Sequence, residues 1–309
     1  MLEFPTDRPH LADLTRWIAR CLPDNPPVEG PVEMLRVKRW GITATYRAGD
    51  RLVVVKDAHP PLFPHAAAVH RAVQRTCPDA VAPLLADCTT DAWQRTIFEF
   101  LPGTTVDEST PKPLALLAGR LGTVQAQLAA ADLAGLPHYE LTQVGPDLLA
   151  DLSTSDDQPA ETVDWLAMEL PRVQEWASEL AELCPASLDH PDANPTNALV
   201  SGDRIVVLDW EEAVVGSPMM SLYRLLVDAR EAGIVNAVRT AYLAAWNHLP
   251  DPERALDLAL LLAPLKLTIE ARYARRLGMD HPHQHQTAKM LTAARRSWTK
   301  YGKIGRHQV

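Results

Sequence analysis

The chain has 309 residues, of which 47% are hydrophobic and 22% charged, and its formal net charge is −9. A chain of this length buries a substantial core without disulfides or a structural metal, and it has room for two domains. The acidic charge disfavours nonspecific binding to nucleic acid or to an anionic membrane, because both need a basic surface. We therefore expect neither as a partner.

Several features indicate a cytoplasmic protein. No stretch approaches the roughly 18 consecutive apolar residues that a membrane span needs, and the N-terminal residues lack the pattern of a secretory signal. The four cysteines are dispersed and form no CxxC pair, which argues against a disulfide framework and a zinc site; they are Cys21, Cys77, Cys88 and Cys184. We expect reduced thiols and a cytoplasmic location.

The first third of the chain predicts a small sheet with helices beside it. Residues 7–22 have apolar side chains at helical spacing, and the prolines that follow end the pattern. The next runs are β-branched or apolar and short, which is typical of strands, apart from one helical stretch at 65–75. The predicted strands are 34–37, 42–46, 52–55, 81–85 and 96–100.

The remaining two thirds is mostly helical in pattern. The predicted helices are 114–133, 161–183, 234–248, 252–277 and 286–301. One hairpin interrupts them, with strands at 198–200 and 204–208 joined by Ser201-Gly202-Asp203. The sequence therefore predicts an α+β protein with a small antiparallel-sheet lobe, residues 1–101, and a larger, mainly helical lobe, residues 102–309.

Oxygen-bearing side chains gather at the ends of this hairpin. His190-Pro191-Asp192-Ala193-Asn194-Pro195-Thr196-Asn197 precedes it, and Asp209-Trp210 follows it. We expect Asp192, Asn197 and Asp209 to converge there, and such ligands suit Mg²⁺ holding a polyphosphate better than a closed all-protein site. The alternative is that these residues only form turns, because Asp and Asn before proline favour turns for local reasons.

In this order, the motifs resemble those of the aminoglycoside phosphotransferase family, which is related to choline kinases and shares the protein-kinase-like fold. Members carry the pattern H-G-D-x-x-x-x-N followed by D-W or D-F-G. The resemblance covers nearly the whole chain. It implies a two-lobed fold in which Asp192 is the catalytic aspartate and Asn197 and Asp209 are the metal ligands.

The same resemblance implies a nucleotide site in the first lobe. Lys56 ends the run Val53-Val54-Val55 and corresponds to the lysine that contacts the α- and β-phosphates of ATP. The segment 99–103 resembles the linker whose backbone binds adenine, which places Glu99 and Leu101 at the nucleotide. Because strand ends commonly carry lysine, a solvated Lys56 is the alternative.

The chain departs from the family pattern at several positions. The first hairpin, around Gly41, has no G-x-G-x-x-G, and the motif glycine is Pro191. The glutamate expected on the helix after Lys56 is absent near Ala66, and the later aspartate that supports the catalytic loop is Ser221. These changes raise the alternative of a catalytically impaired nucleotide-binding pseudokinase that acts as a scaffold or sensor.

We favour an enzyme that uses ATP and Mg²⁺ to phosphorylate a hydroxyl group of a small molecule. The acceptor site is expected after Asp209 and within residues 258–277, where the candidate contacts are Trp210, Glu211, Glu270 and Tyr273. An acidic, partly aromatic site favours a cationic or polyhydroxylated acceptor. These acids could instead lie on solvated helix faces, and Arg272, Arg275 and Arg276 would reverse the charge argument if they faced the site. The sequence leaves the oligomeric state open.

Overall fold

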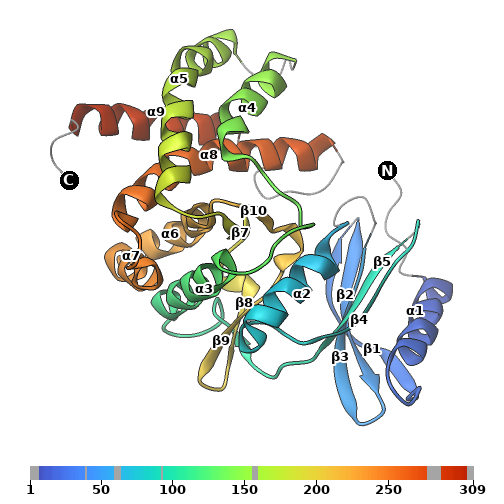
Figure 1. Cartoon of the computed structure of the whole chain (residues 1–309). Helices are drawn as coiled ribbons and strands as arrows, with labels where there is room; N and C mark the ends of the chain where they lie inside the picture. Colours follow the sequence, from blue (N-terminus) through green and yellow to red (C-terminus); the bar gives the residue numbers. More distant parts are fainter. Residues whose placement is uncertain are drawn as a thin grey trace. The chain divides into compact units, whose positions relative to one another are not determined.

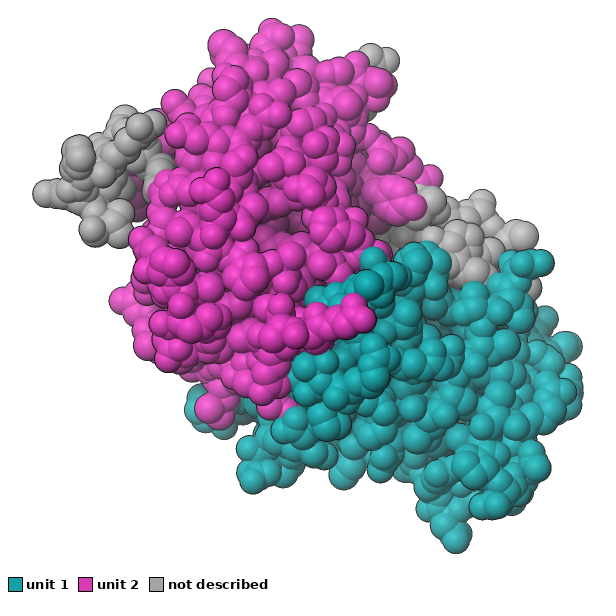
Figure 2. Space-filling model, viewed as in Figure 1, with its two compact units in different colours: residues 1–113, 133–136, 194–212 teal, residues 114–132, 137–193, 213–309 magenta. Residues whose placement is uncertain are grey.

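The structure, a computed structural model, describes residues 7–38, 40–58, 64–91, 93–154, 159–276 and 287–304. The chain divides into two units (Figure 2): unit 1 comprises residues 1–113, 133–136 and 194–212, and unit 2 comprises residues 114–132, 137–193 and 213–309. Within the described ranges, no helix combines the length and apolarity needed to cross a membrane. The units are defined by internal contacts, so the division into lobes after residue 101 stays a prediction.

Unit 1 is built on a five-stranded antiparallel sheet with the strand order β1-β2-β3-β5-β4 (Figure 1). Its strands are β1 (Val28–Lys38), β2 (Gly41–Ala48), β3 (Arg51–Ala58), β4 (Leu84–Thr89) and β5 (Gln94–Glu99). Strand β1 is longer than predicted and contains Pro31. It lies at the edge of the sheet, where the missing N–H of a proline is tolerated.

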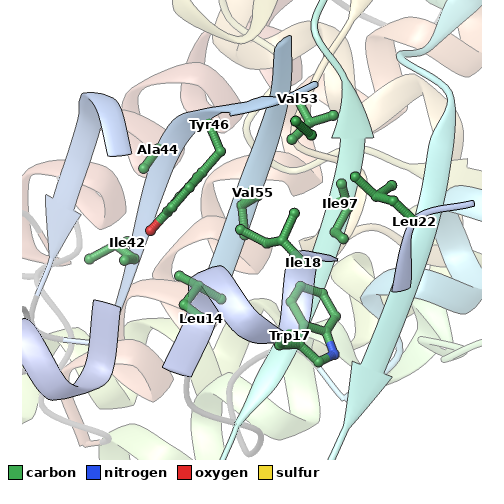
Figure 3. Packing of buried hydrophobic residues seen from close by; sticks show 11 residues of the cluster. Leu14, Trp17, Ile18, Leu22, Ile42, Ala44, Tyr46, Val53, Val55 and Ile97 are labelled. Atoms are coloured by element: carbon green, nitrogen blue, oxygen red, sulfur yellow. The ribbon is translucent and has the colours of Figure 1, made fainter. Parts of the chain in front are cut away.

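Helix α1 (Arg8–Cys21) packs on one face of this sheet (Figure 3). The side chain of Asp7 begins the helix by accepting a hydrogen bond of 3.0 Å from the His10 N–H, one of the donors that a helix start leaves unpaired. Buried apolar side chains join the helix to the sheet, among them Leu14, Ile18, Tyr46, Val53, Val55 and Ile97. This layer fixes which side chains of β3 point toward α1.

The alternation of β3 sends Lys56 to the opposite face. Val53 and Val55 pack against α1, so Val54 and Lys56 point away from it. Helix α2 (Ala66–Thr76) covers that second face, because Ala66 lines a cavity together with Lys56. The sheet thus carries Lys56 on its α2 side.

A second, three-stranded sheet completes unit 1, with the order β6-β8-β9. It consists of β6 (Thr104–Thr105), β8 (Ala198–Ser201) and β9 (Arg204–Val207), so it confirms the predicted hairpin. The Ser201 hydroxyl donates a hydrogen bond of 2.8 Å to the Pro102 carbonyl. A Cβ at Gly103 would lie 2.5 Å from the Val200 carbonyl oxygen, so only glycine lets the chain pass this close to β8.

Unit 2 is mainly helical, as predicted. Its helices are α3 (Leu114–Ala129), α4 (Val144–Ser153), α5 (Ala160–Leu183), α6 (Leu222–Glu231), α7 (Val235–Leu243), α8 (Pro252–Arg276) and α9 (Thr287–Ile304). A short two-stranded sheet pairs β7 (Ser187–Asp189) with β10 (Val214–Gly216). Strand β7 leads directly into the segment that carries Asp192.

Sequence reasoning missed several short elements of unit 2. Helices α4 and α6 were not predicted, nor were β7 and β10, which have three residues each. In unit 1, β4 begins at Leu84 and not at residue 81 as predicted, because residues 78–80 form a 3₁₀ turn and Pro83 follows it. Short apolar runs carry too few periods to distinguish strands from helices.

We predict that Gly122→Ala destabilises unit 2, whereas Gly119→Ala on the same helix does not. A Cβ at Gly122 would lie 2.6 Å from the Tyr242 carbonyl oxygen of α7, a contact that requires a shift of backbone. At Gly119 the nearest atom, the Ala241 carbonyl oxygen, is 3.5 Å away. Thermal unfolding should show a loss of about 1–3 kcal/mol for the first variant and no loss, or a gain of up to about 1 kcal/mol from helix propensity, for the second. Equal stability of the two variants would contradict this packing.

Candidate active site

Lys56 is held between two carboxylates of unit 1. Its Nζ lies 2.6 and 2.7 Å from the two oxygens of Glu211 and also forms an ion pair with Asp209. Burial lowers the pKa of Lys56, but the two carboxylates outweigh this effect and raise the pKa above its ordinary value. Lys56 is therefore a charged, fixed cation and not a solvated strand end.

Glu211 supplies the partner that helix α2 lacks. Ala66 of α2 lines the cavity beside Lys56 but has no carboxylate to offer. Glu211 reaches the same lysine from the segment after β9, two residues beyond Asp209. The helix glutamate is thus absent as expected, and Glu211, one of the residues that we expected as acceptor contacts, pairs with Lys56 in its place.

The cavity next to Lys56 contains a second ionisable side chain. The His70 Nε2 lies 2.7 Å from the Ala82 carbonyl oxygen, which identifies this nitrogen as the donor. Burial lowers the pKa of His70 to about 4, so its ring is neutral at pH 7. His70 thus adds no positive charge that would compete with Lys56 for an anion.

The hairpin β8–β9 places Asn197 next to the segment of Asp209. The Leu208 N–H donates a hydrogen bond of 2.8 Å to the Asn197 carbonyl oxygen, so the residue before Asp209 is tied to Asn197. Asp209 adopts a left-handed backbone with φ of 57°, which aspartate tolerates better than most residues. A carboxylate and a carboxamide are oxygen ligands of the kind that Mg²⁺ takes when phosphates complete its coordination.

A capped turn explains the proline and asparagine before the hairpin. The Asn194 Oδ1 accepts hydrogen bonds of 2.9 Å from the Thr196 N–H and 2.6 Å from its hydroxyl. Pro195 occupies the first position of the 3₁₀ turn Pro195–Asn197, where no N–H is needed. Asn194 therefore has the turn-forming role that the local alternative assigned to the whole motif.

Asp192 belongs to unit 2. Its Oδ1 lies 3.1 Å from a guanidinium nitrogen of Arg224 in α6, and its side chain is partly exposed. The motif crosses from one unit to the other between Ala193 and Asn194. The chain connectivity alone brings Asp192 within five residues of Asn197.

The predicted adenine linker follows β5 in unit 1. Glu99 is the last residue of β5, its side chain is exposed, and its N–H donates a hydrogen bond of 2.9 Å to the Pro83 carbonyl. Leu101 is partly buried. The Glu99 N–H is therefore used inside the sheet.

The expected acceptor contacts have different surroundings. Trp210 is fully buried and its indole N–H donates to the Val207 carbonyl, so it is a core residue and its expected role as an acceptor contact is wrong. Glu270 forms an ion pair with Lys266 and lines a small recess with Pro191. Tyr273 is exposed.

Two of the three arginines near the end of α8, Arg272 and Arg276, form ion pairs within unit 2. Arg272 is buried, and both Arg272 and Arg276 form ion pairs with Asp151 of α4. These two guanidinium groups therefore have a structural partner. They give no support for a reversed, cationic acceptor site.

Sequence reasoning missed three cations that pair with the candidate residues of the two units. Arg36 lies 3.5 Å from Asp209, Arg224 contacts Asp192, and Lys266 contacts Glu270. Arg224 follows Ser221 by one helical turn, a spacing that the sequence displays. Nothing in the local pattern distinguishes Lys266 from an ordinary solvated lysine, because its burial depends on tertiary packing.

Comparison with known proteins defines the class of this protein. The family model described as the phosphotransferase enzyme family matches residues 39–258. Members of this class transfer a phosphoryl group to a hydroxyl group of a small molecule. Because the match spans more than half of the chain, the chain belongs to the phosphotransferase enzyme family. No curated protein gives a significant match.

Solved structures share the fold. A choline/ethanolamine kinase family protein from Mesorhizobium loti has a TM-score of 0.66 and 16% identity, over 93% of this chain and 94% of the other. Macrolide 2′-phosphotransferase from Brachybacterium faecium has a TM-score of 0.59 and 23% identity, over 90% and 97%. Aminoglycoside phosphotransferase APH(4)-Ia has a TM-score of 0.64 and 17% identity, over 93% and 99%. The predicted two-lobed, protein-kinase-like fold class is thereby confirmed.

We predict that Lys56→Met lowers the stability of the protein by about 1–3 kcal/mol, because two carboxylates lose their shared cation. The matched control is Lys112→Met, which removes an ion pair with Asp107 at a similar 2.6 Å but on an exposed surface, and should cost less than about 1 kcal/mol. The pKa of Lys56 is raised, so its contribution is complete below the ordinary value of 10.5 and declines only at higher pH. Thermal unfolding at pH 7 compares the variants; a loss at Lys56 no larger than at Lys112 would contradict the paired arrangement.

Proposed function

We propose that this enzyme transfers the γ-phosphoryl group of ATP to a hydroxyl group of a small molecule, with Mg²⁺ bound by Asn197 and Asp209. The observation that carries the proposal is the convergence of Lys56 and Asp209 in unit 1, next to the hairpin that bears Asn197. A fixed cation beside an oxygen ligand set suits a nucleotide polyphosphate and its metal.

An adenine nucleotide is the donor that the related structures support. Variants of aminoglycoside phosphotransferase APH(4)-Ia have been solved with AMP-PNP and hygromycin B and with ADP and hygromycin B. In this chain, we assign the adenine edge to the backbone of Glu99 and Leu101 and the α- and β-phosphates to Lys56. Glu211 would hold the Lys56 Nζ in place while this ammonium group also contacts phosphate oxygens.

Asp192 is the residue that we assign to the acceptor. Its carboxylate would orient the hydroxyl and take its proton while the hydroxyl oxygen bonds to the γ-phosphorus and the bond to the β,γ-bridging oxygen breaks. Arg224 pairs with this carboxylate and would help to fix its orientation toward the acceptor. When bound, Mg²⁺ supplies positive charge to the phosphate oxygens.

The acceptor is expected beside the segment that contains Asp192. A small recess of unit 2 is lined by Pro191, Lys266 and Glu270, and Tyr273 follows Glu270 by one helical turn. We therefore propose Glu270 and Tyr273 as acceptor contacts. Lys266 faces the two carboxylates of Asp189 and Glu270, so acids outnumber the cation and favour a cationic or polyhydroxylated acceptor over an anionic one.

The alternative of a nucleotide-binding protein without turnover had two motives, the missing helix glutamate and the altered catalytic loop. Glu211 answers the first motive, because it pairs with Lys56 through both of its oxygens. A protein that only binds nucleotide has no chemical need for Asp192 in addition to Asn197 and Asp209. We also propose a cytoplasmic enzyme, which would have ATP and Mg²⁺ at hand, and no nucleic-acid or membrane partner.

We predict that Asp192→Asn lowers turnover by at least about 10²-fold, the effect of a lost general base. Release of phosphate from Mg·ATP, with water as the acceptor, measures this loss, and titration calorimetry should show Mg·ATP affinity unchanged within about twofold. Asp203→Asn, in the exposed turn between β8 and β9, is the control and should leave both quantities unchanged. If Asp192→Asn turned over at the wild-type rate, Asp192 would not act in the reaction.

We predict that Asp209→Ala weakens the binding of Mg·ATP by at least about tenfold, because a hard cation loses an anionic ligand. In the presence of EDTA, the same substitution should weaken the binding of ATP much less, because the metal ion no longer contributes to binding. The control is Glu212→Ala, an exposed residue three positions further on. An Mg²⁺ dependence of ATP affinity as large in Asp209→Ala as in the wild type would place the metal elsewhere.

A further inference from the structure

We propose that Ser221, Asp189 and Lys266 form a buried relay that positions Asp192, in place of the aspartate that the family pattern has at position 221. This inference rests on the proposed role of Asp192. All three residues belong to unit 2, and none of them touches the reacting groups in our proposal. They are positioning residues.

Ser221 holds the backbone just before Asp192. The His190 N–H donates a hydrogen bond of 2.8 Å to the Ser221 Oγ, and the Ser221 hydroxyl donates in turn to the Asp189 Oδ1 at 2.7 Å. The Gln125 Nε2 donates to the same Oγ at 2.8 Å. A serine hydroxyl has one donor and two acceptor sites, so these three bonds fully occupy it and fix its orientation.

The hydrogen bonds around Ser221 are buried. Ser221 and Asp189 are each 1% exposed, and Gln125 is fully buried. A buried donor or acceptor that loses its partner costs far more than an exposed one, because water cannot replace the partner. Breaking the hydrogen bond from the His190 N–H to Ser221 would therefore be costly.

Lys266 supplies the charge that the Asp189 carboxylate needs. Its Nζ lies 2.7 Å from the Asp189 Oδ2, while the Oδ1 of the same carboxylate accepts from Ser221. Burial lowers the pKa of Lys266, but the carboxylates of Asp189 and Glu270 raise it above its ordinary value, so the ammonium group stays charged. Helix α8 is thereby connected to the backbone of His190 through two side chains.

One segment holds both the backbone and the carboxylate around Asp192. Ser221 directly precedes helix α6, and Arg224 lies one turn later on the same side. Ser221 binds the backbone of His190, Arg224 pairs with the side chain of Asp192, and the Ala193 N–H closes the intervening turn onto the His190 carbonyl at 3.3 Å. A serine at 221 thus supports the loop together with the carboxylate at position 189.

The first test is amide hydrogen exchange of the segment 187–193 in Ser221→Ala, without nucleotide. We expect the His190 amide to exchange at least about tenfold faster than in the wild type, because its acceptor is gone. The control is Ser217→Ala: this hydroxyl is buried without a hydrogen-bond partner among the described residues, and its removal should leave exchange unchanged. Unchanged exchange in Ser221→Ala would overturn the proposal.

The second test asks whether the relay acts through Asp192. Ser221→Ala should lower phosphate release from Mg·ATP about tenfold or more in the wild-type background, yet less than about twofold in the Asp192→Asn background, with the Mg·ATP dissociation constant nearly unchanged in both. Equal losses in the two backgrounds would indicate a merely structural role and overturn the proposal. If the alanine variant fails to fold, Ser221→Thr and Ser221→Val provide the same comparison, because they are isosteric and only the first keeps the hydroxyl.

These measurements separate the two proposals. A wild-type protein that releases no phosphate from Mg·ATP would contradict the proposed function, but the exchange of the His190 amide would still report on the relay. Conversely, active wild-type enzyme with unchanged exchange in Ser221→Ala would overturn the relay alone.

Discussion

The charge of Lys56 is the constraint on which the site of unit 1 depends. A partly buried ammonium group is stable only with carboxylates beside it, and here two of them come from the segment after β9. This requirement ties the five-stranded sheet to the β8–β9 hairpin, although the two are separated by roughly half the sequence. The lysine is also on the correct face only because α1 takes the alternate side chains of β3.

Unit 2 also contains a lysine, Lys266, whose charge is balanced by two carboxylates. This lysine is buried between Asp189 and Glu270. Asp189 connects it through Ser221 to the backbone of His190. In both units, a residue type expected from the family pattern is missing, and a carboxylate at another position takes its place. Glu211 replaces a helix glutamate beside Lys56, and Asp189 with Ser221 replaces a loop aspartate.

Much of the fold could be predicted from the sequence because its signals are local. The alternation in β2 and β3, the helical spacing before Pro23 and the long helices of unit 2 are all readable within one element. The motif around Asp192 and Asp209 was readable because its residues are close in the chain. The pairing of Glu211 with Lys56 and the ion pair of Lys266 with Asp189 were missed, because they follow from burial and from partners far away in sequence. Trp210 was misjudged for the same reason: an aromatic side chain after a metal ligand looks accessible in a sequence, whereas packing buries it.

The most direct test of the central proposal is transfer of label from γ-³²P-ATP, with Mg²⁺, to a panel of aminoglycosides, other hydroxylated antibiotics, amino alcohols, nucleosides and sugars. We predict a labelled product with at least one cationic or polyhydroxylated acceptor, formed by the wild-type chain and not by Asp192→Asn, and with no transfer when Mg²⁺ is chelated. Nucleotide binding without transfer to any acceptor and without release of phosphate to water would contradict the proposal and support a protein that only binds nucleotide.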